Sequence, residues 1–210
     1  MNRDKPFELE ARAHEAMPPN DHGFTVGRMH MGNSLAIAAA LLAATPALSA
    51  NWPARTPGPI PNTPGYVQIP DAAVPRDPKH AYKALFQANK GPEDKAKPLA
   101  VLNRIAGLHN ALTLAKVPTS NIQFAAIFFG PAVDALLTDQ AYRAKHGVPN
   151  PNLTLIDQLV KGGVKFYVCG QFMAASDTPR SAIIPQAQVA ESATLVMIRL
   201  VNDGYAFLPN

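Results

Sequence analysis

The stretch GGVKFYVCGQFMAAS, residues 162–176, decides the fold class of this chain. It follows a helical pattern that begins after Asn152, a common N-cap residue, and its two glycines close that helix. Residues 164–168 then read as a short strand rich in Val and aromatic side chains. Cys169, the one cysteine of the chain, comes directly after this strand and before a glycine. A helix that leads through a tight turn into a strand is typical of α/β folds.

The same alternation of strands and helices continues on both sides of this stretch. Residues 121–129 (NIQFAAIFF) are almost all apolar, which is typical of a strand covered on both faces in a parallel sheet. Further strands are predicted at 81–87 and 205–208, and helices at 98–116, after Gly130-Pro131, and at 192–202. Short connections between alternating elements imply βαβ units. We therefore expect an α/β domain with a mostly parallel sheet of four or five strands and helices on both faces.

The N-terminal fifty residues have the pattern of a targeting segment. Residues 34–44 are uncharged and rich in Ala and Leu, Arg28 precedes them, and small residues end the run at 47–50. This is the pattern of a cleavable secretory signal peptide, and the apolar run is too short to cross a bilayer. We predict a signal peptide at 29–50, with residues 1–28 as either a wrongly assigned start or a disordered extension.

A proline-rich segment separates this leader from the domain. Residues 51–78 contain eight of the 21 prolines. Proline lacks a backbone donor and fixes φ, so this segment cannot form a helix or a central strand. We expect an extended arm, either a plain spacer or a segment that lies across a neighbouring subunit. The folded domain is placed at 79–210.

The composition excludes several classes of function. The chain is 47% hydrophobic and 16% charged, as in ordinary globular domains, and its net charge of +4 is scattered. Basic runs typical of nucleic-acid binding are absent from the sequence. It has no glycine-rich phosphate loop and no C-x-x-C pair, and His80, His109 and His146 lack metal-ligand spacing. No metal site is predicted, and the three histidines are expected at the surface.

Two strand ends carry the candidate site. Phe129-Gly130-Pro131 follows one strand and Cys169-Gly170-Gln171 follows another. In a parallel sheet both lie at the same edge, where open α/β sheets bind their ligands. Backbone amides of the turn after Cys169 would stabilise the thiolate, which is the nucleophilic form, and glycine permits a close backbone approach. A buried thiol that packs as a small hydrophobe explains Cys169 at least as well.

Two asparagines on the first predicted helix form a second feature. Asn103 and Asn110 are seven residues apart, so they share one face of the helix. The residue pattern leaves three roles open for them: lining a polar site, binding loop carbonyls, or forming a solvated stripe.

Four segments, taken in chain order, resemble the DsrE/DsrF-like family of small sulfur-relay proteins. They are NRIAGLHNAL (103–112), FFGPAV (128–133), GGVKFYVCGQFMAAS (162–176) and NDGYAFLP (202–209). The resemblance covers about residues 80–210. It implies a three-layer α/β/α fold assembled into trimers or hexamers. It also implies that Cys169 accepts a sulfane sulfur as a persulfide and passes it on. Many relatives carry a histidine where this chain has Phe129, so the site here is more apolar.

The leading interpretation is an exported, periplasmic, DsrE-like sulfur carrier or sulfurtransferase. In this interpretation Cys169 holds the sulfur, and Gly170 and Gln171 shape the turn around it. Phe129 and Gly130 line the pocket. Asn110 approaches the site from the first helix.

The expected partners are a sulfur donor or acceptor, either a protein or a small sulfur compound, and further copies of the chain. Persulfide exchange needs no metal and no organic cofactor. No nucleic acid and, after processing, no membrane is expected as a partner. Two other interpretations stay open. One is a non-catalytic oligomeric binding or scaffold protein with a buried cysteine, and the other is a small-molecule binder that uses Phe128, Phe129 and Phe172.

Overall fold

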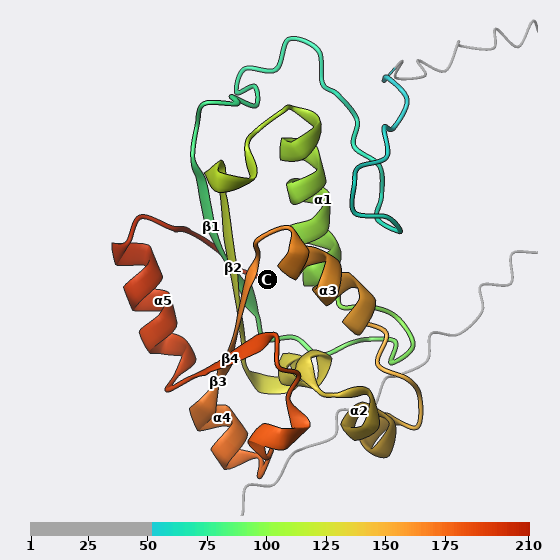
Figure 1. Cartoon of the computed structure of the whole chain (residues 1–210), viewed down its shortest axis with the longest axis vertical. Coiled ribbons are helices and arrows are strands. Elements are labelled where there is room, and N and C mark those ends of the chain that lie inside the picture. The colour runs from blue at the N-terminus through green and yellow to red at the C-terminus, as the bar shows by residue number, and fades with distance from the viewer. Residues whose placement is uncertain (1–51) are drawn as a thin grey trace, which may run out of the picture. The chain divides into compact units, whose positions relative to one another are not determined.

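A computed structural model describes residues 52–210 as one parallel sheet with helices on both faces (Figure 1). The strand order is β4-β3-β2-β1-β5, and every pairing is parallel. The strands are β1 (Tyr82–Ala88), β2 (Ile122–Phe128), β3 (Lys165–Cys169), β4 (Ala187–Ala190) and β5 (Ala206–Leu208). The helices are α1 (Ala100–Leu114), α2 (Asp139–His146), α3 (Leu153–Lys161), α4 (Gly170–Ala175) and α5 (Ala193–Asn202), with 3-10 helices η1 (Thr119–Asn121), η2 (Gly130–Leu136) and η3 (Arg180–Ala182). The predicted α/β fold is confirmed, with five strands.

The leader predicted from the sequence lies outside the described residues. This applies both to the extension at 1–28 and to the signal peptide at 29–50. Among the helices between residues 52 and 210, none combines the length and the hydropathy that a membrane span requires.

β2 lies at the centre of the sheet because its side chains are apolar on both faces. It pairs with β1 from Tyr82–Ile122 to Ala88–Phe128, and with β3 on its other side. Successive side chains of a strand point to opposite faces. Those of β2 therefore divide between a larger and a smaller core: Ile122, Phe124, Ala126 and Phe128 in the larger, Ala125 and Ile127 in the smaller.

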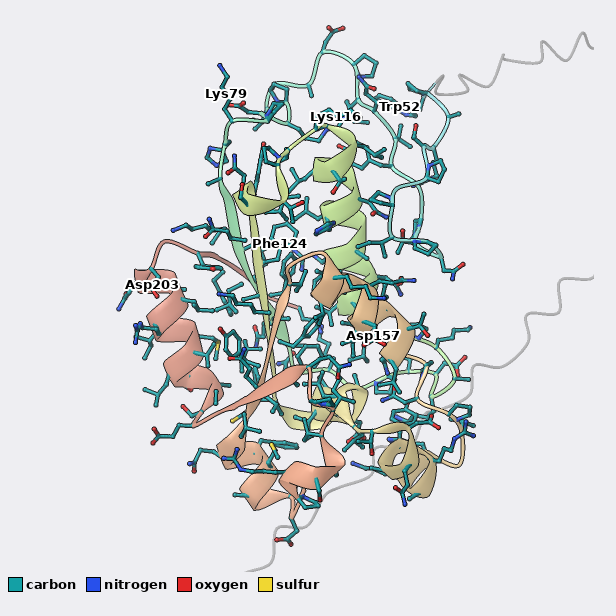
Figure 2. The ribbon with its side chains drawn as sticks, in the orientation of Figure 1. Trp52, Lys79, Lys116, Phe124, Asp157 and Asp203 are labelled. Atoms are coloured by element: carbon teal, nitrogen blue, oxygen red, sulfur yellow. The ribbon has the colours of Figure 1, made fainter. Side chains whose placement is uncertain are left out.

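The two faces of the sheet are covered unequally. α1 and α3 lie over the larger core, and Figure 2 shows Phe124 between the sheet and α1. α5 alone lies on the opposite face, where it contacts β1, β2 and β3 (Figure 1). The cause is the topology. β1 to β4 are added side by side in chain order, whereas α5 carries the chain back to β5, next to β1. Because crossovers are right-handed, this reversal of direction moves the helix to the other face.

The proline-rich segment 52–78 contains no helix and no strand of the sheet, as expected, and lies along α1. An isolated antiparallel bridge between Thr56 and Tyr66 closes a loop in it. Ile60 within this loop is buried, and Asn110 of α1 binds its main chain on both sides. The Asn110 Oδ1 accepts from the Ile60 N–H at 2.9 Å, and the Asn110 Nδ2 donates to the Ile60 carbonyl at 2.9 Å. The arm thus contacts its own domain.

Two polar residues have roles other than those predicted. Asn152 occupies the N-cap position of α3, but its side chain makes no capping hydrogen bond. Its Oδ1 accepts instead from the Leu99 N–H at 2.8 Å, which joins the start of α3 to the start of α1. His109 is buried rather than at the surface, with its Nε2 3.0 Å from the Gly162 carbonyl oxygen. Both side chains are used to join α1 to the α3 segment, which the sequence pattern did not indicate.

Candidate functional site

Cys169 is the last residue of β3, and its side chain lies on the sheet face that α5 covers. The β2–β3 register pairs Phe128 with Val168, so Phe129 and Cys169 follow side by side at the carboxyl edge. The two strand ends therefore meet, as the sequence indicated. Cys169 belongs to the smaller core, whose other buried members are Leu85, Ala125, Ile127 and Ala193, with Phe129 and Phe172 packed against them.

The sulfur of Cys169 accepts hydrogen bonds from two backbone amides. The Phe172 N–H donates to Sγ at 3.4 Å, and the Ala193 N–H donates at 3.3 Å. Cys169 is the N-cap of α4, and Ala193 is the first residue of α5. N–H groups in the first turn of a helix have no partner within the helix, and that end of the helix is positive. The sulfur therefore lies at the N-terminal ends of two helices, with one N–H group of each pointing at it.

The second of these donors was not predicted from the sequence. The turn after Cys169 suggested an amide such as that of Phe172. Ala193 is 24 residues further along the chain, and β4 and the turn after it bring it to the sulfur. No local motif marks such a contact, because it depends on the pairing of β4 with β3.

The sulfur is buried in apolar surroundings. Cys169 is 6% exposed, and the side chains packed with it in the smaller core are all uncharged. A donor molecule therefore reaches the sulfur only if part of this cover moves.

Gly170 and Gln171 hold the start of α4 against the end of β4. A Cβ at Gly170 would lie 2.7 Å from the Ala190 carbonyl oxygen. The Gln171 N–H donates to the Glu191 carbonyl at 3.2 Å, while the Gln171 side chain is exposed. The close approach that requires a glycine is thus made by the last residue of β4.

Gly130 turns the chain away from the sheet beside Phe129. Its φ is +58°, in the left-handed region that favours glycine. The Phe129 N–H still donates to the Ala88 carbonyl at 3.0 Å, so the ladder runs one residue past β2 before the turn. This extension leaves the Phe129 side chain packed against the smaller core, to which Cys169 also belongs.

Two predicted groupings are not brought together. Asn110 lies on α1, across the sheet from Cys169, and its side chain is used by the arm, including a 2.8 Å bond from Nδ2 to the Thr63 Oγ1. Phe128 is fully buried in the core under α1 and α3, whereas Phe129 packs in the core under α5. Phe128, Phe129 and Phe172 therefore do not line one pocket.

A separate cluster of titratable groups joins α2 to η2. The carboxylate of Asp134 is 2.9 Å from the His146 Nε2 and 2.6 Å from the Lys145 Nζ. Burial raises the pKa of the adjacent Tyr142, whose hydroxyl donates to the Lys95 carbonyl at 3.0 Å. Within residues 52–210, no three His, Cys, Asp or Glu side chains gather as metal ligands would.

Comparison with known proteins places this chain in a family. Among solved structures, the chain is similar to the "Structure of Protein of Unknown Function MTH1491 from Methanobacterium thermoautotrophicum". The identity is 18% and the TM-score 0.45, over 61% of this chain and 99% of that chain. No curated protein gives a significant match. A sequence model described as the DsrE/DsrF-like family matches residues 83–209. Because that match runs from β1 to β5 and includes Cys169 with both strand-end turns, the chain belongs to the DsrE/DsrF-like family.

Proposed function

We propose that the protein carries sulfur as a persulfide on Cys169. Membership of the DsrE/DsrF-like family suggests a role of the sulfur-relay type. The observation that carries the proposal is the pair of helix N-terminal amides, from Phe172 and Ala193, that donate to the Cys169 sulfur. The thiolate is the form that attacks a sulfane sulfur, and these two N–H groups point at the atom that would carry its charge.

The loading step is a thiol–persulfide exchange that needs no external oxidant. The Cys169 thiolate attacks the outer sulfur of a donor R–S–SH, the donor S–S bond breaks, and a new S–S bond forms on Cys169. The products are Cys169–S–SH and the thiolate R–S⁻. In the unloading step, an acceptor thiolate attacks the outer sulfur of Cys169–S–SH and releases the Cys169 thiolate.

The neighbouring residues would fix the position of the sulfur. Gly170 lets the first turn of α4 lie close to the end of β4, which brings the Phe172 amide to Sγ. Gly130 makes the turn that follows Phe129, whose side chain packs against the same core as Cys169. Because Cys169 is 6% exposed, loading requires the Phe172 side chain or the first turn of α4 to shift.

A second candidate function is favoured by the same burial. The sulfur caps α4 and binds the first amide of α5, so a purely structural role explains its contacts. The protein would then be an oligomeric binding or scaffold protein whose one cysteine is structural.

The place of action and the assembly belong to the same proposal. The apolar segment with small residues at its end, within 29–50, supports export to the periplasm. We propose an assembly of several copies, in which the donor or acceptor of sulfur binds at the carboxyl edge of the sheet.

Intact-mass measurement tests sulfur carriage directly. The purified protein is incubated with polysulfide or thiosulfate beside the variant Cys169→Ser. We expect the mass of one sulfur atom to be added to the wild-type protein, to be absent from the variant, and to be removed by a reductant. A maleimide probe applied to the native and the urea-unfolded protein provides the second reading. An unchanged mass with every donor, together with labelling only after unfolding, would contradict sulfur carriage and support the scaffold function.

A further inference from the structure

Cys169 is the point where the starts of two helices meet. Its Sγ accepts from the Phe172 N–H of α4 at 3.4 Å and from the Ala193 N–H of α5 at 3.3 Å. A thiol sulfur is bonded to Cβ and to its proton, and here the two amides approach the electron pairs that remain. Because Cys169 is 6% exposed, the space around the proton is taken by the uncharged side chains of the smaller core.

A second sulfur atom on Cys169 therefore has no open position in this arrangement. The S–S bond of a persulfide places the outer sulfur about 2.05 Å from Sγ. If the outer sulfur takes the place of an amide, the start of that helix is displaced. If it takes the place of the proton, it enters the smaller core, and a close-packed interior accommodates an added atom only by moving. In both cases, loading displaces an element that covers the sulfur.

α4 is held at its start by contacts that do not involve the sulfur. A Cβ at Gly170 would lie 2.7 Å from the Ala190 carbonyl oxygen, and the Gln171 N–H donates to the Glu191 carbonyl at 3.2 Å. The main chain of α4 is thus fixed to the end of β4 and to the residue that follows it. The shift that admits a donor is then that of the Phe172 side chain.

α5 is held at its start by the sulfur. Ala193, whose N–H donates to Sγ, is the only buried residue of this helix, and Leu195 and Ile198 on its outer side are 51% and 54% exposed. The Ser192 Oγ accepts from the Leu195 N–H at 3.1 Å, so α5 keeps its N-cap when the Ala193 bond is broken. α5 is therefore the element that can move, as a formed helix, when the side chain of Cys169 is extended.

We propose that sulfur loading on Cys169 breaks the Ala193 bond and displaces the first turn of α5, while α4 keeps the Phe172 bond. The inference rests on the proposed function and adds a regulatory step to it. Glu191 and Ser192, between β4 and α5, lie at the carboxyl edge of the sheet, where the sulfur acceptor is proposed to bind. An acceptor that contacts these two residues distinguishes the loaded protein from the empty one.

Amide hydrogen exchange of the full chain, resolved by residue with NMR, tests the displacement. The wild-type protein is compared before and after incubation with polysulfide, and its mass verifies the added sulfur. We expect the Ala193 amide to exchange about 5- to 30-fold faster in the loaded protein, the effect of losing one capping bond. The Phe172 amide is expected to change by less than about twofold, because α4 is fixed to β4.

A methylthiolated form tests the displacement without sulfur carriage. Cys169 is modified with methyl methanethiosulfonate in urea, and the protein is refolded. The thiolate displaces methanesulfinate and gives Cys169–S–S–CH3, which places a second sulfur where the persulfide has its own. We expect the Ala193 amide to lose the same protection. The control is Val160→Cys with Cys169→Ser, modified in the same way, because Val160 is exposed on α3; here Ala193 is expected to keep its protection.

The outcomes separate this inference from sulfur carriage. Sulfur that adds to Cys169 without faster exchange at Ala193 would overturn the displacement and leave carriage standing. Faster exchange at Ala193 in the methylthiolated protein, in a chain that takes up no sulfur from any donor, would support the displacement and contradict carriage. Release of Phe172 with Ala193 retained would overturn the choice of α5. A methylthiolated protein that does not refold, judged by circular dichroism, would also overturn it, because a shift of α5 alone would then not accommodate a second sulfur.

Discussion

The Cys169 thiol also links the N-terminal ends of two helices. Its sulfur is the acceptor for one amide of α4 and one of α5, and both amides lie at the border of the smaller core. Removal of the sulfur would leave these donors without partners, and unpaired donors are costly when buried. The structural and the chemical roles of Cys169 are therefore separable only by a substitution that keeps an acceptor.

The first prediction uses such a substitution. Cys169→Ser keeps an oxygen that accepts from Phe172 and Ala193, whereas Cys169→Ala keeps none. We expect the alanine variant to be less stable than the serine variant by about 1 to 2 kcal/mol, the range for loss of an N-cap. Urea unfolding of both variants measures this difference. Equal stability would show that the sulfur contributes nothing as a cap.

The second prediction concerns Gly170. A Cβ at this position would meet the Ala190 carbonyl oxygen at 2.7 Å, and backbone atoms cannot easily move aside. We expect Gly170→Ala to destabilise the protein by about 1 to 3 kcal/mol.

A glycine elsewhere in the chain serves as the matched control for Gly170→Ala. Gly107 lies inside α1, with no heavy atom within 4 Å of a Cβ built there. Gly107→Ala should stabilise the protein by up to about 1 kcal/mol, because alanine favours the helix. Thermal unfolding compares the two, and equal effects would contradict the close approach at Gly170.

At the residue scale, the sequence predicted contacts between neighbouring residues but not contacts between segments that are far apart in the chain. The position of Cys169 at a strand end and the amide of Phe172 follow from neighbouring residues. The Ala193 amide and the role of Asn110 do not, because each joins segments 24 and 50 residues apart. The sequence around an asparagine does not indicate which main-chain groups its side chain will bind.

At the scale of elements, the arm is attached to the domain through α1. Asn110 makes three hydrogen bonds to Ile60 and Thr63, and Arg76 donates to the Ala111 carbonyl at 2.7 Å. Gly58 passes so close that a Cβ there would overlap Asn110. The contact is thus built from one helix residue and a chain without secondary structure.

The third prediction is that Asn110→Ala releases the arm. Loss of these bonds is expected to cost about 1 to 3 kcal/mol and to open residues 52–78 to proteases. The control is Asn103→Ala on the same helix, since the Asn103 side chain makes no hydrogen bond seen within residues 52–210. This control should change stability by less than about 0.5 kcal/mol. Limited proteolysis followed by mass measurement would show an uncut arm if the contact is unimportant.

The fourth prediction concerns the acid stability of α2. The Arg143 side chain, 2.6 Å away, and then the Asn150 N–H lower the pKa of Asp139. A carboxylate with a lowered pKa in the folded state stabilises the protein above its unfolded pKa, near 4, and this contribution is lost as the pH falls through the folded value. The stability difference between wild type and Asp139→Asn should therefore shrink below about pH 4. Urea midpoints from pH 7 to pH 2.5 measure it, and a constant difference would contradict the pairing.

Long apolar elements were predictable from the sequence, whereas of the short ones only β5 was predicted, at 205–208. β1, β2, β3, α1, α3 and α5 occur within a few residues of the predicted ranges because each has a continuous apolar run or a helical period. β4 has four residues and α4 has six, too few for a period to be recognised. After Gly130-Pro131 the helical pattern forms a 3-10 helix first, and α2 begins only at Asp139.

At the scale of the whole molecule, the unequal covering of the sheet follows from chain order. A mostly parallel sheet with helices on both faces was predicted, since right-handed crossovers restrict an alternating α/β sequence to few arrangements. The pairing of β5 with β1 was not predictable, because nothing in the three residues of β5 indicates which strand it pairs with. The exposure of Leu195, Ile198 and Val201 on the outer side of α5 is a result of this pairing.

The pairing of β5 with β1 also determines which part of the sheet folds last. Ala84 pairs with Ala206, so this edge of β1 stays open until residues 122 positions further along the chain have been synthesised. Until then Leu85 and Ile127, which α5 later covers, stay open to water, and such an unfinished sheet is prone to aggregate. The thiol of Cys169 shares that exposure, because the amide of Ala193 reaches it only when α5 docks. The cysteine that is 6% exposed in the folded protein is thus more open to chemical attack while the chain is being synthesised.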